Sequence, residues 1–124
     1  MRKLARFFQA LSDETRLRIL NVIIQRECCV CEVVQALQIS ETRASRNLSV
    51  LCDAGFLKAR REGLWVLYSI DNENLKENYP HLLSSISNEL KSNPLAVQDL
   101  VRLSFAKRTG LGCTPKKLSA SPAR

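Results

Sequence analysis

Hydrophobic side chains recur at helical spacing through the first half of the chain. Apolar positions three and four residues apart predict four helices, over residues 2–11, 13–26, about 33–37 and 41–54. We expect Ser12 to cap the second helix and Ser40 the fourth, because a serine hydroxyl accepts a hydrogen bond from a free N–H group in the first turn. Gly55 is placed to end the fourth helix, where a left-handed backbone is common.

The pattern then changes from helical spacing to alternation. Two alternating runs, residues 56–61 and 64–70, flank Glu62-Gly63 and predict a two-stranded hairpin with a glycine in its turn. The side chains expected to face the core are those of Val66, Tyr68 and Ile70. Residues 72–78 read as a polar linker or a loose helix. Helical spacing returns at residues 80–91 and 95–107, with Asn93-Pro94 as the break between them.

This succession predicts a mainly α fold with a small β-hairpin, in the order ααααββα. A pair of short helices followed by a basic hairpin is the winged helix-turn-helix architecture. We expect one such domain over residues 1–108, since a chain of 124 residues suits a single core. Residues 109–124 are rich in Gly, Pro, Ser and Lys and are expected to form a basic, disordered tail.

The positive charge is uneven along the chain. The net charge is +7, and residues 102–124 hold six basic side chains and no acidic one. The remaining residues are nearly neutral, with 13 basic and 12 acidic side chains. Two interpretations of the tail stay open: non-specific binding to phosphates, or a segment that is only solvated.

Three cysteines lie within four positions, in the segment Glu27-Cys28-Cys29-Val30-Cys31-Glu32. Thiolates are the ligands that select thiophilic metals, and so dense a group points to a metal site more than to core packing. On a regular helix, residues two apart differ by about 200° of rotation, so Cys29 and Cys31 would point to opposite sides. We therefore expect that one ion could bind both only if the first turn of the third helix were distorted. Cys52 lies on an apolar helix face and is expected to be a core residue.

The fourth helix has the character of a DNA-recognition helix. Such a helix presents polar side chains at its N-terminal end, where Arg, Asn, Ser and Thr can contact bases or phosphates. The candidate DNA-binding residues are Ser40, Thr42, Arg43, Ser45, Arg46 and Asn47, with Arg60 and Arg61 on the hairpin.

Other functional classes fit poorly. The chain has one histidine and no phosphate-binding glycine loop, and Cys28 to Cys31 is not embedded in a strand–helix unit, so we expect no enzyme. No signal peptide or run of about 18 apolar residues is present, so we expect a cytoplasmic protein that is not in a membrane.

Four segments together resemble the ArsR/SmtB family of bacterial metal-sensing repressors. They are residues 11–20, 27–32, 39–56 and 61–68, and the resemblance is good over about residues 4–71. The Cys-Val-Cys sequence looks most like the arsenite-responsive branch. The resemblance implies a homodimeric winged-helix repressor on a palindromic DNA operator, released when As(III) or Sb(III) binds. It also implies that the dimer forms through residues 2–11 and the region around residues 82–105.

By position in that motif, Cys29 and Cys31 match the first two arsenic ligands. Where the enterobacterial form has a third cysteine, this chain has Val34. A third donor would be Cys28 or Cys113, from the same or the partner chain, with Cys113 slightly favoured; a two-thiol site would suit a methylated arsenical. Two alternatives remain open: a sensor of Cd, Pb or Zn, although the cadmium branch has a further N-terminal cysteine that is absent before Cys28, and a thiol-redox-responsive repressor.

Overall fold

A computed structural model describes residues 1–109, and Cys113 and most of the predicted tail lie outside these described residues. The helices before the hairpin are α1 (Arg2–Leu11), α2 (Glu14–Gln25), α3 (Val30–Leu37) and α4 (Glu41–Asp53). The hairpin consists of β1 (Leu57–Glu62) and β2 (Trp65–Ile70). The helices that follow are α5 (Asn72–Asn78), α6 (Leu82–Leu90) and α7 (Pro94–Phe105). The predicted order ended in one helix, whereas three helices follow the hairpin within residues 1–109.

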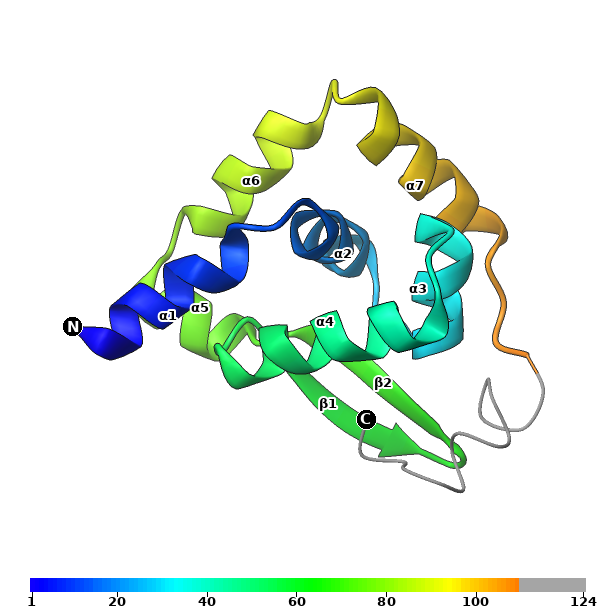
Figure 1. Ribbon diagram of the computed structural model, residues 1–124, viewed down its shortest axis with the longest axis horizontal. Coiled ribbons are helices and arrows are strands. Elements are labelled where there is room, and N and C mark those ends of the chain that lie inside the picture. Colours follow the sequence, from blue (N-terminus) through cyan, green and yellow to red (C-terminus); the bar gives the residue numbers. More distant parts are fainter. Residues whose placement is uncertain (110–124) are drawn as a thin grey trace.

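Helix α2 lies at the centre of the molecule and the other elements surround it (Figure 1). In this view α6 and α7 arch above α2, α1 and α3 lie on either side, and α4 runs below it with the hairpin extending beyond. The buried residues on α2 include Ile19, Leu20 and Val22, which are 0% exposed. No helix within residues 1–109 combines the length and the apolar character that a membrane crossing needs.

Side-chain caps fix where the first helices begin. Asp13 adopts an extended backbone and its carboxylate accepts a hydrogen bond from the N–H of Arg16 at 3.0 Å, so it caps α2. The prediction that Ser12 is this cap is wrong, because Ser12 is the residue that ends α1. Ser40 does cap α4 as predicted, and its hydroxyl accepts from the N–H of Arg43 at 3.1 Å.

The connection between α3 and α4 is tight, as its sequence predicts. Gln38 has a left-handed backbone (φ 59°), which stops α3 and turns the chain toward Ser40. Gly55 follows α4 at φ +94° and accepts a hydrogen bond on its carbonyl from the amide of Asn74 at 2.9 Å. A Cβ at Gly55 would lie 2.7 Å from that Asn74 amide nitrogen, and the left-handed backbone at φ +94° favours glycine here.

The hairpin is buried on both faces of β2, where burial of one face was expected. Tyr68 and Ile70 pack into the main core as predicted. Leu67, on the opposite face, is 0% exposed and joins a second cluster with Cys29 and Cys31. The turn also differs by one residue from the prediction, because β1 continues through Glu62 before Gly63 turns the chain at φ +61°. The segment before α3 therefore covers the face of β2 that was expected to be solvated.

A buried carboxylate joins the last helix to the centre of the fold. Asp99 on α7 is 0% exposed and accepts two hydrogen bonds from Arg18 on α2, both at 2.8 Å. Arg102 donates to the same carboxylate at 2.9 Å. The two guanidinium groups also donate to carbonyls at the end of α3, Arg18 to Leu37 and Arg102 to Ala36. The end of α3 is thus held against both α2 and α7.

Candidate functional site

Cys29 and Cys31 bring their sulfurs together at the start of α3. The two Sγ atoms lie 3.0 Å apart, and Cys29 and Cys31 are 1% and 7% exposed. Cys29 has an extended backbone (φ −90°, ψ 173°) and precedes the helix, which begins at Val30. The expectation that the sulfurs diverge assumed that both residues are helical. Since Cys29 lies outside the helix, the pair converges without any distortion of the first turn.

The separation of the two sulfurs fits capture of one soft ion. A metal–sulfur bond of about 2.3 Å and a bond angle near 90–110° require sulfurs about 3.3–3.8 Å apart. The observed 3.0 Å has to open by less than about 1 Å to reach that range. Within residues 1–109, no group of three or more Cys, His, Asp or Glu side chains is arranged to hold a metal ion. Cys31 is a free thiol and Cys29 is disulfide-bonded, so the two sulfurs could act together as thiolate donors only in the reduced protein. The position of Cys113 is not described.

The thiol pair is enclosed by apolar side chains of the hairpin. Leu67 and the half-buried Trp65 pack against Cys29 and Cys31. Burial raises the pKa of the Cys31 thiol, and hydrogen bonding to Thr109 acts in the opposite direction. An apolar enclosure of this kind limits the approach of water and favours a soft ion over a strongly hydrated one.

The side chain of Cys28 points away from Cys29 and Cys31. Its side chain is 0% exposed and lies in the main core, separate from the Cys29–Cys31 cluster. Burial raises the pKa of its thiol to about 12, and the sulfur donates to the carbonyl of Arg26 at 3.4 Å. Of the three clustered cysteines, the fold therefore brings two together and turns the third away.

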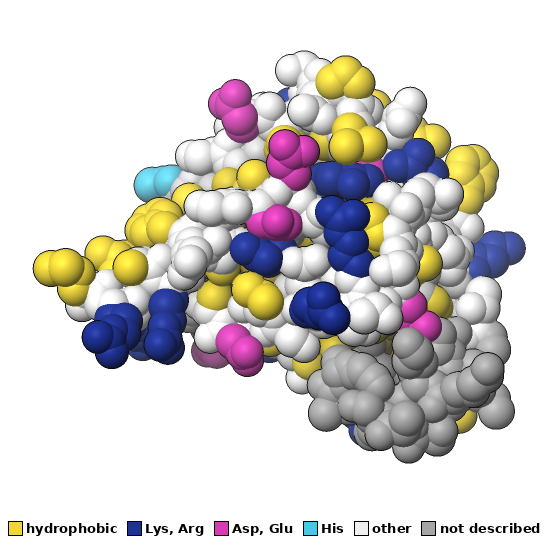
Figure 2. Space-filling model, viewed as in Figure 1, with side chains coloured by type: hydrophobic (Ala, Val, Ile, Leu, Met, Phe, Trp, Pro, Cys, Tyr) yellow, Lys and Arg dark blue, Asp and Glu magenta, His cyan; other side chains and the backbone are white. Residues whose placement is uncertain are grey.

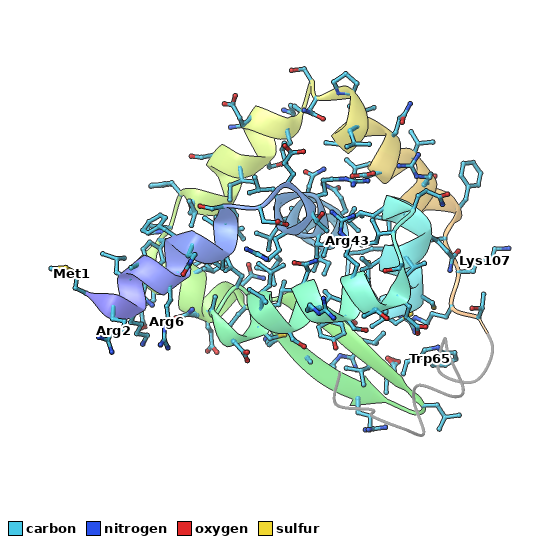
Figure 3. The ribbon with its side chains drawn as sticks, viewed as in Figure 1. Met1, Arg2, Arg6, Arg43, Trp65 and Lys107 are labelled. Carbon is cyan, nitrogen blue, oxygen red and sulfur yellow. The ribbon has the colours of Figure 1, made fainter. Side chains whose placement is uncertain are left out.

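The chain after α7 runs along α3 beside the thiol pair. Gln35 holds this segment by two hydrogen bonds to the backbone of Lys107, accepting from its N–H at 3.0 Å and donating to its carbonyl at 2.6 Å. Arg108 pairs with Glu32 at 3.5 Å, and its guanidinium lies 5.6 Å from the ring centre of Trp65. Figure 3 shows Lys107 on this segment and Trp65 near the outer end of the hairpin. The last described residues thus lead directly past Cys31.

Helix α4 carries the second group of candidate residues. Ala44, Leu48 and Leu51 are 0% exposed and anchor one face of this helix in the core. The outer face carries the predicted polar side chains: Ser40, Thr42, Arg43 and Arg46 are exposed, and Ser45 and Asn47 are half-buried. Dark blue Lys and Arg side chains are spread from the outer end of α1 across the middle of this face of the molecule (Figure 2). A basic surface with an exposed polar helix suits nucleic acid.

Two of these side chains are held by contacts within the protein. Arg43 donates to the hydroxyl of Thr15 at 2.6 Å, which places it between α4 and α2 (Figure 3). Asn47 accepts from Arg16 at 3.0 Å and donates to the carbonyl of Arg43 at 2.9 Å. Both polar atoms of the Asn47 amide are therefore engaged in the free chain.

The hairpin separates the two predicted wing arginines. Arg60 is opposite Leu67 in the register and Arg61 is opposite Val66, so their side chains point to different faces. Arg60 donates to both carboxylate oxygens of Glu27, at 2.9 and 2.8 Å, and also to Glu62 at 3.1 Å. Arg61 is exposed, on the face away from the thiol pair.

Several residues that shape these sites were not singled out from the sequence. Glu27, Gln35 and Leu67 act through contacts with residues more than 30 positions away, and no local pattern marks them. Arg2 and Arg6 are exposed and project together from one side of α1 (Figure 3). Their spacing of four residues is a signal that could have placed them on one helix face.

Comparison with known proteins identifies the architecture. The model of bacterial regulatory proteins of the arsR family matches residues 13–59, which span α2 to β1. A homodimeric winged helix-turn-helix domain from Mycobacterium bovis, a possible ArsR-family transcriptional regulator, superposes with a TM-score of 0.62 at 30% identity. The match covers 74% of this chain and 82% of that one. The predicted winged helix-turn-helix fold is thereby confirmed.

Two curated relatives are named as metal-resistance regulators. The arsenical resistance operon repressor of Bacillus subtilis is 30% identical over 76 residues, covering 60% of this chain and 72% of that protein. The cadmium resistance regulatory protein CadC homolog of Staphylococcus aureus is 42% identical over 74 residues, covering 59% of this chain. The chain spans about three fifths (61%) of the length of that cadmium regulator. These relatives are named as an operon repressor and a transcriptional regulatory protein, and the chain belongs to the arsR family of bacterial regulatory proteins.

Proposed function

We propose that this protein is a transcriptional repressor of an arsenic-resistance operon, which releases its operator when As(III) or Sb(III) binds Cys29 and Cys31. The observation that carries the proposal is the 3.0 Å approach of these two sulfurs at the start of α3, the helix that leads into α4. The name of the Bacillus relative supports the arsenical effector. Because α3 and α4 are joined by a tight turn, a shift at the start of α3 would be transmitted along α3 to the DNA-facing helix.

The DNA contact is assigned to the outer face of α4. The side chains available for this contact are those of Ser40, Thr42, Ser45 and Arg46. Arg43 and Asn47 would first have to break their hydrogen bonds within the protein, to Thr15 and to the carbonyl of Arg43 respectively. Arg61 is the better wing contact, because Arg60 already pairs with Glu27. Phosphate contacts would supply most of the affinity and make it salt-dependent.

The repressor is proposed to act as a homodimer on a palindromic site. Large apolar side chains are exposed on α1 and α7: Leu4, Phe8, Leu95, Val97, Val101 and Phe105. Their burial between two copies would explain this exposure. The resulting two-fold symmetry would match two half-sites.

A third donor for As(III) would be Cys113 in preference to Cys28. Cys28 points into the main core and its pKa is raised to about 12. Cys113 follows Thr109 by four residues, so it can lie no more than about 14 Å from the segment that passes Cys31. With two protein donors only, the site would instead suit a monosubstituted arsenical.

The test is an operator-binding titration. Fluorescence anisotropy of labelled operator should fall on adding arsenite to the reduced wild-type protein. Cys29→Ser and Cys31→Ser should bind DNA and ignore arsenite, whereas Cys52→Ser, on α4, should respond like the wild type. Cys113→Ser and Cys28→Ser distinguish the two third donors. An arsenite-insensitive wild type would refute the arsenic assignment.

Cadmium is the second candidate effector, because the Staphylococcus cadmium regulator is 42% identical over 74 residues. The same titration with Cd²⁺ separates the two possibilities. Release by Cd²⁺ at a lower concentration than arsenite would favour a cadmium sensor. Release by peroxide, with no effect of either metal, would favour the thiol-redox alternative.

A further inference from the structure

The segment that carries the thiol pair is attached to the β-wing as well as to α3. Cys28 and Tyr68 form an isolated antiparallel bridge, in which the N–H of Cys28 donates to Tyr68 at 3.0 Å and the N–H of Tyr68 donates to Cys28 at 2.7 Å. The residue just before the thiol pair is therefore hydrogen-bonded to the middle of β2. Any shift of this segment acts directly on the wing strand.

A second attachment joins the same segment to β1. The carboxylate of Glu27 accepts both hydrogen bonds of the Arg60 fork, at 2.9 and 2.8 Å. This bidentate geometry fixes the direction of both side chains, unlike a single contact. Arg60 and Glu27 are 33 residues apart, and their contact joins the segment before α3 to the β1 strand of the wing.

The sulfurs themselves form the third attachment. Cys29 and Cys31 pack on Leu67 and Trp65 of β2, on the face of the hairpin to which Arg60 also belongs. Opening the sulfur pair from 3.0 Å to accept an ion displaces groups that touch this face. The recognition helix α4 begins beyond the C-terminal end of α3, after the turn at Gln38.

We propose that Glu27 is a positioning residue that transmits occupancy of the thiol pair to the wing through Arg60, so that the wing is a regulated part of the DNA-binding surface. This inference rests on the proposed function and names a regulatory route for the same site. In the free protein the latch between Glu27 and Arg60 holds the hairpin in one orientation, with Arg61 on the opposite face. Binding of an ion to Cys29 and Cys31 shifts the Glu27–Arg60 ion pair and thereby changes the orientation of the hairpin.

The experiment measures the ratio of operator dissociation constants with and without effector, using arsenite and Cd²⁺ as separate probes. Glu27→Gln should reduce this ratio by roughly two- to fivefold, the effect expected for one partly exposed ion pair. Combining Glu27→Arg with Arg60→Glu reverses the pair and should restore the ratio. Glu62→Gln is the matched control, since it removes the other carboxylate at Arg60 and leaves the Glu27 contact in place. Its ratio should equal that of the wild type.

Amide hydrogen exchange of β2 tests the same inference without DNA. Saturating Cd²⁺ should change the exchange of residues 65–70 in the wild type and much less in Glu27→Gln. Equal ratios in wild type and Glu27→Gln, a reversed pair that stays uncoupled, or β2 exchange that Cd²⁺ leaves unchanged would each overturn the inference. If Cd²⁺ changes the exchange of β2 but neither probe releases operator, the proposed function fails and the coupling to the wing stands.

Discussion

Asp99 is the most deeply buried of the polar residues within residues 1–109. Its side chain is fully buried, and its charge is balanced by Arg18 and Arg102, which donate to it at 2.8 to 2.9 Å. Hydrogen bonding to Asp99 raises the pKa of Arg18 above its ordinary value, so this guanidinium stays protonated at neutral pH. A buried ion pair adds little compared with apolar packing, but removing one partner is costly because the other is left uncompensated.

Asp99→Asn should therefore lower the free energy of unfolding by about 3 kcal/mol. Urea denaturation at one fixed protein concentration would measure this loss, since self-association also affects apparent stability. Asp53→Asn is the control, because Asp53 is exposed and its change should alter stability by less than about 0.5 kcal/mol. Equal midpoints for the two variants would contradict the role given to Asp99.

Cys52 offers a second test at the scale of a single residue. Burial raises the pKa of its thiol to about 11, so at pH 8 its thiolate fraction is about a hundredfold smaller than for a thiol with a pKa of 9.0. Iodoacetamide should accordingly modify Cys52 about a hundredfold more slowly in the native protein than in urea. Peptide mapping by mass spectrometry would follow this residue alone. Similar rates in both solvents would show that the thiol is not protected.

At the scale of elements, the cap of α4 has an effect that can be isolated. Ser40→Ala removes the acceptor for the N–H of Arg43 and should lower stability by about 1 kcal/mol. Ser49→Ala is the matched control, because Ser49 is exposed on the same helix and alanine favours helix there. Thermal unfolding should separate the two variants. A Ser40→Ala protein as stable as Ser49→Ala would mean that the turn at Gln38 fixes the start of α4 without help.

Much of the element order could be predicted because periodicity and caps are local signals. The bounds of α1 and the start of α4 are as predicted, since apolar spacing and Ser40 mark them. Asp13 rather than Ser12 caps α2, and both residues are good caps, so composition alone could not choose between them. The helical stretches predicted at residues 80–91 and 95–107 correspond to α6 and α7, and only the summary order counted too few helices after the hairpin.

The candidate site was predicted in its residues but not in its geometry. Clustering was enough to single out Cys29 and Cys31, yet their convergence depends on one backbone conformation, that of Cys29 before the helix. The burial of Leu67 and the latch between Glu27 and Arg60 depend on how the hairpin folds back over residues 27–31. Such long-range contacts carry no periodic signal in the sequence.

At the scale of the whole molecule, most of the large apolar side chains that are exposed within residues 1–109 lie on α1 and α7. Phe8 on α1 is 46% exposed, and Val101 and Phe105 on α7 are 54% and 76% exposed. Yellow side chains are visible at the outer end of α1 and along the rim formed by α6 and α7 (Figure 2). A monomer would leave this surface in water, at a cost that grows with the apolar area exposed.

Introducing a charge on this surface should therefore separate the protomers. Phe8→Glu and Val101→Glu each place a carboxylate where the proposed dimer buries apolar area, and burying an unpaired charge is costly. Light scattering after size-exclusion chromatography should give twice the chain mass for the wild type and the chain mass for both variants at micromolar concentration. Leu64→Glu is the matched control, since Leu64 is 47% exposed at the hairpin turn, away from α1 and α7, and should leave the mass unchanged. Operator affinity should fall together with the mass in the first two variants, because a monomer can occupy only one half-site of the operator. A dimeric Val101→Glu protein would exclude α7 from the interface, and a monomeric Leu64→Glu protein would move the interface to the wing.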